Sequence, residues 1–290
     1  MFSCKQTFSL GAAFVSLVFC ATPTAQAHAC VWKVTGPRGG ILYLGGSIHA
    51  LRSTDYPLPG EYNRAFELSD RLAFEVDPKA MRNAAHDAEK AGLYRRGDSL
   101  KNHVDPRTYD YLRRFFALVK IPEAKFSSYR PWYLAAMLQA PQLHGLSPEL
   151  GVEGFLTKRA QANHVPISGL ETSREAMAVF SGLSDRQSEA VLLLTFIPQQ
   201  EGAGAMEKMT AAWRRGDAET IAREMKEQAA DFPAFEERLI DARNRAWLPK
   251  IEGHLGSGQT FFVVVGAGHL GGSNGLLALL RSRGCQIEQL

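Results

Sequence analysis

Two segments, one near each end of the chain, deliver a histidine three residues after a glycine. The first ends in Gly46-Ser-Ile-His49 and the second in Gly266-Ala-Gly-His269. With 26 Gly and 8 His in 290 residues, chance supplies roughly 0.7 such spacings, so the context must carry the argument. Both turns follow an apolar run that is typical of a strand. Because open α/β sheets bind ligands at the carboxyl ends of strands, the two imidazoles can face one crevice.

Glu75 is the carboxylate best placed to join the two histidines. It lies inside the apolar run 72–76, and a buried carboxylate needs a cation, a metal or several hydrogen-bond donors. The alternative is a solvated glutamate on an edge strand. With His49 and His269 it forms a two-histidine, one-carboxylate set that suits Zn²⁺, Mn²⁺ or Fe²⁺. Asp77 points to the same face of the strand and is the substitute ligand.

Six predicted strands position these residues. The first two flank a glycine-rich turn and form a hairpin, and the fifth is an unbroken apolar run, as expected for a strand buried on both faces. Helical patterns fill most of the chain between the third and fifth strands. This order predicts an α/β fold, a mixed central sheet of about six strands with a large helical insertion lobe. The strands are expected at residues 30–34, 41–48, 71–77, 165–170, 260–266 and 285–290.

The first 27 residues have the features of a secretory signal peptide. Lys5 is their only charged side chain, an apolar stretch covers residues 8–21, and Ala25-Gln-Ala27 is a small-x-small cleavage site. Cleavage leaves 290 − 27 = 263 residues. We expect residues 28–290 to form a single domain that is periplasmic or secreted.

The charge and hydropathy of the remaining chain argue against a nucleic-acid partner and against a membrane-spanning segment. Loss of Lys5 leaves 33 − 1 = 32 basic and 30 acidic side chains, a net charge of +2. So balanced a chain gives no electrostatic reason to expect a nucleic-acid partner. No later apolar run approaches about 18 residues, so no integral membrane segment is expected after cleavage.

Two cysteines, Cys30 and Cys285, remain after cleavage, and each opens a predicted terminal strand. In an oxidising compartment this favours a disulfide over two separate buried thiols. If the terminal strands are neighbours, the bond would close a very long loop. The chain-entropy estimate for such a loop is up to about 4–5 kcal/mol of added stability.

Arg243 and Asn244 lie in a predicted helix that carries a charged stripe. Such a stripe is usually a solvated helix face. The functional alternative is an arginine that binds a substrate carboxylate or stabilises an oxyanion. The sequence contains neither a Walker loop nor a His-Glu-x-x-His metalloprotease motif.

The order of these segments resembles the TraB/GumN family. That family includes the animal TIKI metalloproteases and is distantly similar to erythromycin-esterase-like and ChaN-like proteins. The resemblance implies a secreted or membrane-attached α/β protein and metal-dependent hydrolysis of a peptide bond. Its most specific marks are the two Gly-x-x-His turns and the glutamate between them. The matching segments are residues 32–34, 44–49, 74–75, 169–172, 243–244 and 265–270.

The resemblance also implies roles for individual residues. His49, Glu75 and His269 match the proposed catalytic or metal positions. The accessory positions are matched by Glu171, by Arg243 with its neighbour Asn244, and by Glu153, which follows a Gly-Val pair.

Three functions are compatible with these observations. The leading one is a metal-dependent hydrolase, a peptidase, in which His49 and His269 hold a divalent ion such as Zn²⁺, Mn²⁺ or Co²⁺. Glu75 is then the third ligand or the general base, and Arg243 stabilises the oxyanion. The second is a metal-independent, esterase-like hydrolase with His49 as general base, oriented by Glu75. The third is a protein that binds haem or another ligand without turnover. The substrate, a peptide or a small molecule, is left open.

Overall fold

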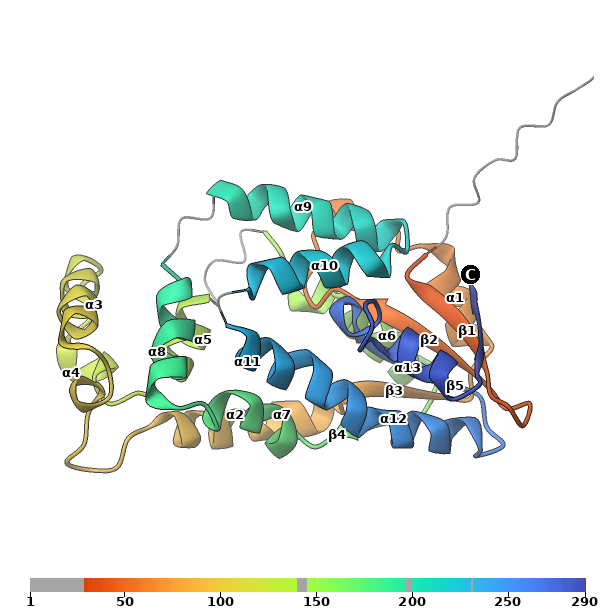
Figure 1. Ribbon diagram of the computed structural model, residues 1–290, viewed down its shortest axis with the longest axis horizontal. Helices are drawn as coiled ribbons and strands as arrows, with labels where there is room; N and C mark the ends of the chain where they lie inside the picture. The colour runs from red at the N-terminus through yellow and green to blue at the C-terminus, as the bar shows by residue number, and fades with distance from the viewer. Residues whose placement is uncertain (1–28, 140–144, 197–199, 231) are drawn as a thin grey trace, which may run out of the picture.

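A computed structural model describes residues 29–139, 145–196, 200–230 and 232–290 (Figure 1). The predicted signal peptide and its cleavage site at Ala27 lie outside the described residues. The strands are β1 (Val31–Thr35), β2 (Ile41–Ser47), β3 (Arg71–Val76), β4 (Ile167–Glu171), β5 (Phe261–Gly266) and β6 (Gln286–Gln289). All six predicted strands are therefore confirmed, with small changes at their ends.

Helices make up most of the rest. The α-helices are α1 (Gly60–Glu67), α2 (Pro78–Gly92), α3 (Pro106–Leu118), α4 (Glu123–Phe126), α5 (Pro131–Gln139), α6 (Val152–Ala162), α7 (Ser173–Ser181), α8 (Asp185–Leu194), α9 (Gln200–Arg214), α10 (Ala218–Gln228), α11 (Pro233–Glu236), α12 (Ala242–Leu255) and α13 (Leu276–Ser282). Short 3₁₀ turns are η1 (Ser53–Asp55), η2 (Leu100–Asn102), η4 (Pro148–Leu150) and η6 (Ala267–His269). A π-helical turn, η5 (Glu237–Asp241), leads into α12.

The strands form one mixed sheet in the order β4-β3-β5-β2-β1-β6. β2, β5, β3 and β4 are parallel neighbours, whereas β1 is antiparallel to both β2 and β6. The carboxyl ends of four adjacent strands therefore meet at one edge of the sheet. β5 lies at the centre and is buried along almost its whole length, as its unbroken apolar sequence predicts. The predicted α/β fold, with a mixed sheet and a helical lobe, is confirmed.

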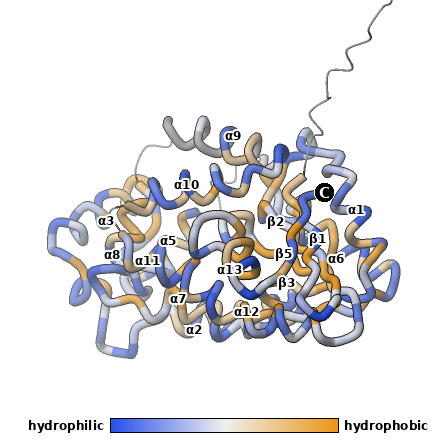
Figure 2. The backbone as a smooth tube through the Cα atoms, turned by 45° about the vertical axis from the view of Figure 1, so that its right-hand side comes forward, coloured by the Kyte–Doolittle hydropathy of each residue, from blue (hydrophilic) through white to orange (hydrophobic). Residues whose placement is uncertain are grey.

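Two groups of buried side chains hold the fold together. The larger group surrounds the sheet and includes Leu44, Phe74 and Trp247. The smaller group lies in the helical lobe, where α3, α4, α5 and α8 pack together around Leu112 and Phe126. Figure 2 shows the hydrophobic strands inside and mostly hydrophilic helices outside. No helix in the described ranges combines the length and apolarity needed to cross a bilayer.

The predicted disulfide does not form in this fold. Among the described residues both cysteines, Cys30 and Cys285, are buried free thiols. The terminal strands are neighbours, as expected, but β1 pairs with β6 in a register that joins Thr35 to Gln286. Cys285 therefore lies beside position 36, six residues from Cys30. At about 3.3 Å per residue of strand, the two thiols lie at opposite ends of the ladder.

We accordingly expect Cys30 and Cys285 to be free thiols. Burial raises the pKa of the Cys30 thiol, so this group should react slowly in the folded state. After unfolding in guanidinium without reductant, a thiol reagent should label Cys30 and Cys285 stoichiometrically. Labelling that appears only after reductant is added would show that the disulfide does form.

Candidate functional site

Each of the four parallel strands delivers one polar residue to the carboxyl edge of the sheet. β2 and β5 pair in register from Leu42–Phe261 to Ser47–Gly266, so the two Gly-x-x-His turns leave the sheet side by side. Glu75 lies near the end of β3, beside β5, and Glu171 ends β4, where it pairs with Val76. The sheet order thus gathers residues that are far apart in the sequence.

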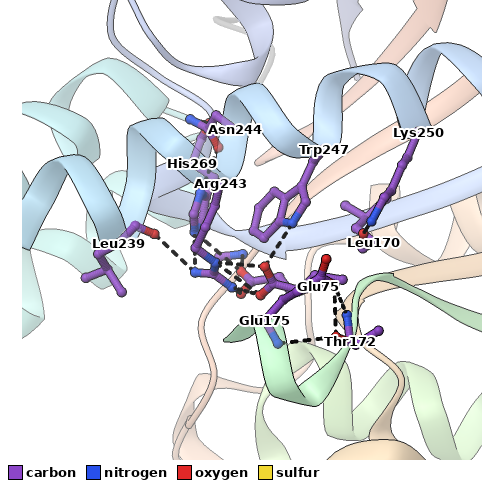
Figure 3. A network of polar contacts seen from close by, with 12 residues as sticks. Glu75, Leu170, Thr172, Glu175, Leu239, Arg243, Asn244, Trp247, Lys250 and His269 are labelled. Carbon is purple, nitrogen blue, oxygen red and sulfur yellow. Dashed lines mark hydrogen bonds and ion pairs between the residues drawn. The ribbon is translucent and has the colours of Figure 1, made fainter. Parts of the chain in front are cut away.

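Helix α12 supplies the cation that joins the glutamates (Figure 3). Arg243 Nη2 donates to Glu75 Oε2 and to Glu171 Oε1, each at 2.5 Å. Its Nε also donates to Glu171, and its Nη1 donates to the Leu239 carbonyl and lies 3.3 Å from His269 Nε2. All five N–H groups of a guanidinium are thereby used. The charged stripe is therefore not a solvated face at Arg243, which is only 13% exposed.

Glu75 is held as a carboxylate by this environment. Its Oε1 accepts from the backbone N–H of Gly266 at 2.7 Å, and its Oε2 pairs with Arg243. Burial alone would raise its pKa, but His269 and Arg243 outweigh burial, and the pKa falls to about 2. Of the two sequence interpretations, the buried carboxylate with a partner cation is the one observed.

The protonation pattern of His269 is fixed by Asn244. The Asn244 side-chain amide donates to the carbonyls of His269 and Asn274, so its oxygen must face His269 Nδ1, 2.8 Å away. That oxygen can only accept, so Nδ1 carries the proton and Nε2 is unprotonated, with its lone pair facing Arg243 Nη1. Burial lowers the pKa of His269 to about 4. The imidazole is therefore neutral at neutral pH.

This shift predicts how stability depends on pH in chelator-treated protein. The folded pKa of His269, about 4, lies below the ordinary value of 6.5. The unfolded chain therefore binds the extra proton between these values, and stability falls as the pH drops from 6.5 towards 4. Chemical unfolding of wild type and His269→Gln across this range measures the effect, and we expect a shallower slope in the variant. Equal slopes in wild type and variant would contradict the lowered pKa of His269.

His49 is oriented by Glu153 and not by Glu75. Its Nδ1 lies 2.7 Å from Glu153 Oε1, which also accepts from the Ser47 hydroxyl at 2.5 Å. The charge and hydrogen bond of Glu153 raise the pKa of His49 to about 9. Without a metal, His49 is thus protonated at neutral pH, and its Nε2 is directed towards Gly266.

Gly266 marks the point on which the three groups converge. A methyl group built on it would lie 3.2 Å from Glu75 Oε1, 3.4 Å from His49 Nε2 and 3.6 Å from His269 Cδ2. The backbone of Gly266 has a negative φ of −51°, so glycine is needed there for space and not for conformation.

The first Gly-x-x-His turn, which begins at Gly46, is fixed by hydrogen bonds from buried aromatic side chains. Trp213 Nε1 donates to the Gly46 carbonyl and to the Tyr62 hydroxyl, each at 2.8 Å, and the Tyr62 hydroxyl donates to the same carbonyl. Trp247 packs on the His269 ring at 4.6 Å between centroids and donates to Glu171. Sequence reasoning missed these supports. Only Trp247 carries a local signal, because it lies one helical turn after Arg243.

Three other sequence patterns do not play the part that their residues suggest. Asp77, the substitute ligand, instead caps α2 by accepting from the backbone N–H groups of Lys79 and Ala80. Residues 266–271 match a Gly-x-Gly-x-x-Gly spacing, but they form a 3₁₀ turn, and a Cβ on Gly268 would strike Met225. Residues 271–275 match Gly-x-Ser-x-Gly, yet they follow that turn and not a strand.

The donor atoms suit a divalent metal, although they do not stand at coordinating positions. Within the described ranges, no group of three His, Cys, Asp or Glu side chains is arranged to hold a metal ion. His269 Nε2 and Glu75 Oε1 are 3.7 Å apart, close to the spacing of two ligands on one ion. Arg243 Nη1 lies against the same nitrogen. The set thus fits a metal in its chemistry and requires that guanidinium group to turn away.

The fold and the site together define an α/β protein with a buried polar centre at the carboxyl edge of its parallel strands. This chain belongs to the TraB/PrgY/gumN family, whose model matches residues 30–289. It is 26% identical over 254 residues to "Uncharacterized protein YbaP" of Escherichia coli (strain K12), covering 86% of this chain and 90% of that protein. The Shigella flexneri protein of the same name matches to the same extent. No solved structure matches significantly.

Proposed function

We propose that this protein is a metal-dependent hydrolase of amide or ester carbonyl groups, with a peptide bond as one such group. His49, Glu75 and His269 would hold the divalent ion. The proposal includes export to the periplasm or beyond, which rests on the predicted signal peptide. The bound ion would supply a Lewis acid and a water of lowered pKa.

One observation carries the proposal, namely the way each imidazole is held by its second nitrogen. Nδ1 of His49 faces Glu153, and Nδ1 of His269 faces Asn244. Histidine ligands of metals almost always donate their other N–H to an oxygen acceptor, which fixes the tautomer and orients the ring. A methyl group built on one glycine, Gly266, would thereby lie 3.4 Å from His49 Nε2, 3.6 Å from the neighbouring ring carbon of His269 Nε2 (Cδ2) and 3.2 Å from Glu75 Oε1.

The chain's own residues would divide the remaining work. In the metal-bound protein His49 Nε2 would be a ligand, whereas in the metal-free version His49, which is close to solvent with 70% of its side chain exposed, can donate a proton to a leaving group. His269 offers an unprotonated Nε2, and Glu75 stays negative. Arg243 is a positioning residue, because its five N–H groups already have acceptors. The predicted role of Arg243 in stabilising an oxyanion would require it to leave one of them.

Arg243 also favours a metal-independent version of the same hydrolase. Its guanidinium already places a positive charge beside Glu75 and His269, which is where a metal ion would lie. In this version His49 and His269 exchange protons with water and substrate directly. The carboxylate that orients His49 is then Glu153, in place of the expected Glu75.

Metal analysis and hydrolysis measured on the same samples test the proposal. Protein never exposed to chelator should hold one divalent ion per chain and hydrolyse members of a peptide and aryl-ester panel. Chelation should abolish both, and metal should restore both. If wild type holds no divalent ion and His269→Ala hydrolyses as well as wild type, the proposal is overturned.

Hydrolysis that survives exhaustive chelation but is lost in His269→Ala supports the metal-independent version. A Soret band that appears on haem titration and is abolished by His49→Ala supports the third alternative, a protein that binds haem without turnover.

Gly266→Ala should separate activity from stability. The backbone of Gly266 accepts alanine, so we expect a change in the free energy of unfolding within about 1 kcal/mol. The new methyl group would lie among Glu75, His49 and His269, so hydrolysis and metal content should fall at least about tenfold. Steady-state kinetics, metal analysis and chemical unfolding measure the three quantities.

Gly45→Ala is the matched control, because its methyl group would press on the Phe262 ring inside the core. That variant should lose stability, since overpacking typically costs about 1–3 kcal/mol. Activity in Gly266→Ala that equals wild type would show that the three groups do not work on a common atom.

A further inference from the structure

A cavity of about 700 Å³ adjoins the polar centre, a volume within the range of small-molecule sites. Its wall on the sheet side holds His49, Glu75 and His269. The opposite walls come from helices α2, α5, α7, α9 and α10. Figure 1 shows α9 and α10 on one side of this region and α2 and α7 on the other.

The helical walls are almost entirely apolar. Ser173 is the one hydroxyl that these helices supply among the described lining residues, and the rest are aliphatic, aromatic or methionine side chains. Four of the seven methionines in the chain line the cavity, namely Met81, Met177, Met209 and Met225. Methionine is unbranched and flexible, so such a wall adapts to flexible apolar ligands.

This lining does not suit a peptide. An extended peptide presents an N–H and a carbonyl at every residue, and each would be costly to bury without a partner. Away from the polar centre, the described lining offers few groups that could pair with them.

Haem is also a poor match to the charges of the lining. Its two propionates need cations, yet Arg243 is the lone lysine or arginine among the described lining residues. Its guanidinium already pairs with Glu75 and Glu171, so the described lining offers no pair of cations for two carboxylates, whereas the single carboxylate of a fatty acid can face His49 at the polar centre. An unbranched hydrocarbon chain, which needs no polar partner, fits these walls best.

We propose that the cavity takes the unbranched acyl chain of a carboxylic ester or amide. This inference rests on the proposed hydrolase and names its substrate class. The acyl carbonyl lies at the polar end, beside His49 and His269, and the chain extends between α7 and α9. In the reaction, the oxygen of water bonds to the acyl carbon and the C–O or C–N bond breaks. One proton passes to the leaving alcohol or amine, and the product is the free fatty acid.

Binding of sodium laurate tests the cavity without any catalytic step. Trp132 and Trp213 line the cavity, so their fluorescence should report saturable binding, which calorimetry then quantifies. Ala176→Trp fills the cavity from α7 and should weaken binding by more than about tenfold, since the ligand loses the space. Ala88→Trp fills the same cavity from α2, so the inference can still be tested if Ala176→Trp fails to fold.

Ala178→Trp is the matched control. It lies on the same helix as Ala176, is exposed and is outside the lining, so it should bind laurate as wild type does. Absence of laurate binding overturns the inference, as does unchanged binding in folded Ala176→Trp and Ala88→Trp. Haem or an apolar peptide that displaces laurate and binds more tightly would also overturn the acyl assignment.

Hydrolysis of p-nitrophenyl acetate and laurate separates the two proposals. We expect Ala176→Trp to hydrolyse p-nitrophenyl acetate as wild type does and to hydrolyse p-nitrophenyl laurate more than about tenfold more slowly. His49→Ala should hydrolyse neither ester. Acetate hydrolysis without laurate binding would sink the acyl pocket alone. Laurate binding without hydrolysis of any ester or amide would sink the hydrolase and leave the acyl-binding cavity standing.

Discussion

Replacing Arg243 with methionine is expected to lower the free energy of unfolding by about 3–5 kcal/mol, the usual result of removing one partner from a buried ion pair. Methionine keeps most of the length and apolar volume of the side chain, so lost packing is a small part of the effect. The large part is electrostatic. Glu75 and Glu171 are only 16% and 6% exposed, and without the guanidinium these two buried carboxylates lose the cation that they share.

Guanidinium titration at neutral pH measures this effect, and repeating it with both glutamates neutralised isolates its cause. In a Glu75→Gln, Glu171→Gln background, Arg243→Met should destabilise the protein much less, since no buried negative charge is left uncompensated. Arg245→Met is a matched control two residues further along α12, because Arg245 and its partner Glu237 are both about half exposed. Exposed pairs are worth about 0–1 kcal/mol. A loss below about 1 kcal/mol in Arg243→Met would contradict the structure of the centre.

The sequence was sufficient for features that depend on neighbouring residues. The apolar run of β5 and the glycine turns after Gly46 and Gly266 are local patterns. They correctly place these strands and the two histidines. Because parallel strands all present their carboxyl ends at one edge, the meeting of His49 and His269 followed from this local information.

Features that depend on strand order and register were not predictable in this way. Nothing near Glu75 states that β5 lies between β2 and β3, yet that order brings Glu75 within reach of Gly266. The disulfide prediction was wrong for the same reason. β1 and β6 are neighbours, but an antiparallel register separates Cys30 from Cys285 along the strands. Neighbouring strands are thus a weak guide to which residues touch.

The charged stripe of α12 shows a further limit. A solvated stripe and a buried ion-pair network have the same composition, so sequence alone left Arg243 open. The difference comes from where the helix packs, and Trp247, four residues later, lies buried against the site with Arg243 over its ring. A large aromatic residue on the charged face of a helix is therefore evidence that this face is buried.

His269→Ala should reduce hydrolysis by about a thousandfold, within the range for loss of a proton-transfer group. Under the metal-dependent proposal the variant should also hold no divalent ion, because two donors would remain. The free energy of unfolding should fall too little to explain the loss of activity by unfolding, since Trp247 and Asn244 still fill their own positions. Single-turnover kinetics, metal analysis and chemical unfolding on the same preparation measure all three.

His254→Ala is the control that gives this result its meaning. His254 is half-buried and stacks on Phe261 at 4.0 Å between ring centroids, so it shares the packing role of His269 but lies outside the site. Its loss should change stability and leave kcat and metal content unchanged. If both variants lose activity in proportion to stability, His269 is a packing residue. If only His269→Ala loses activity, and metal content is lost with it, the second Gly-x-x-His turn supplies a ligand.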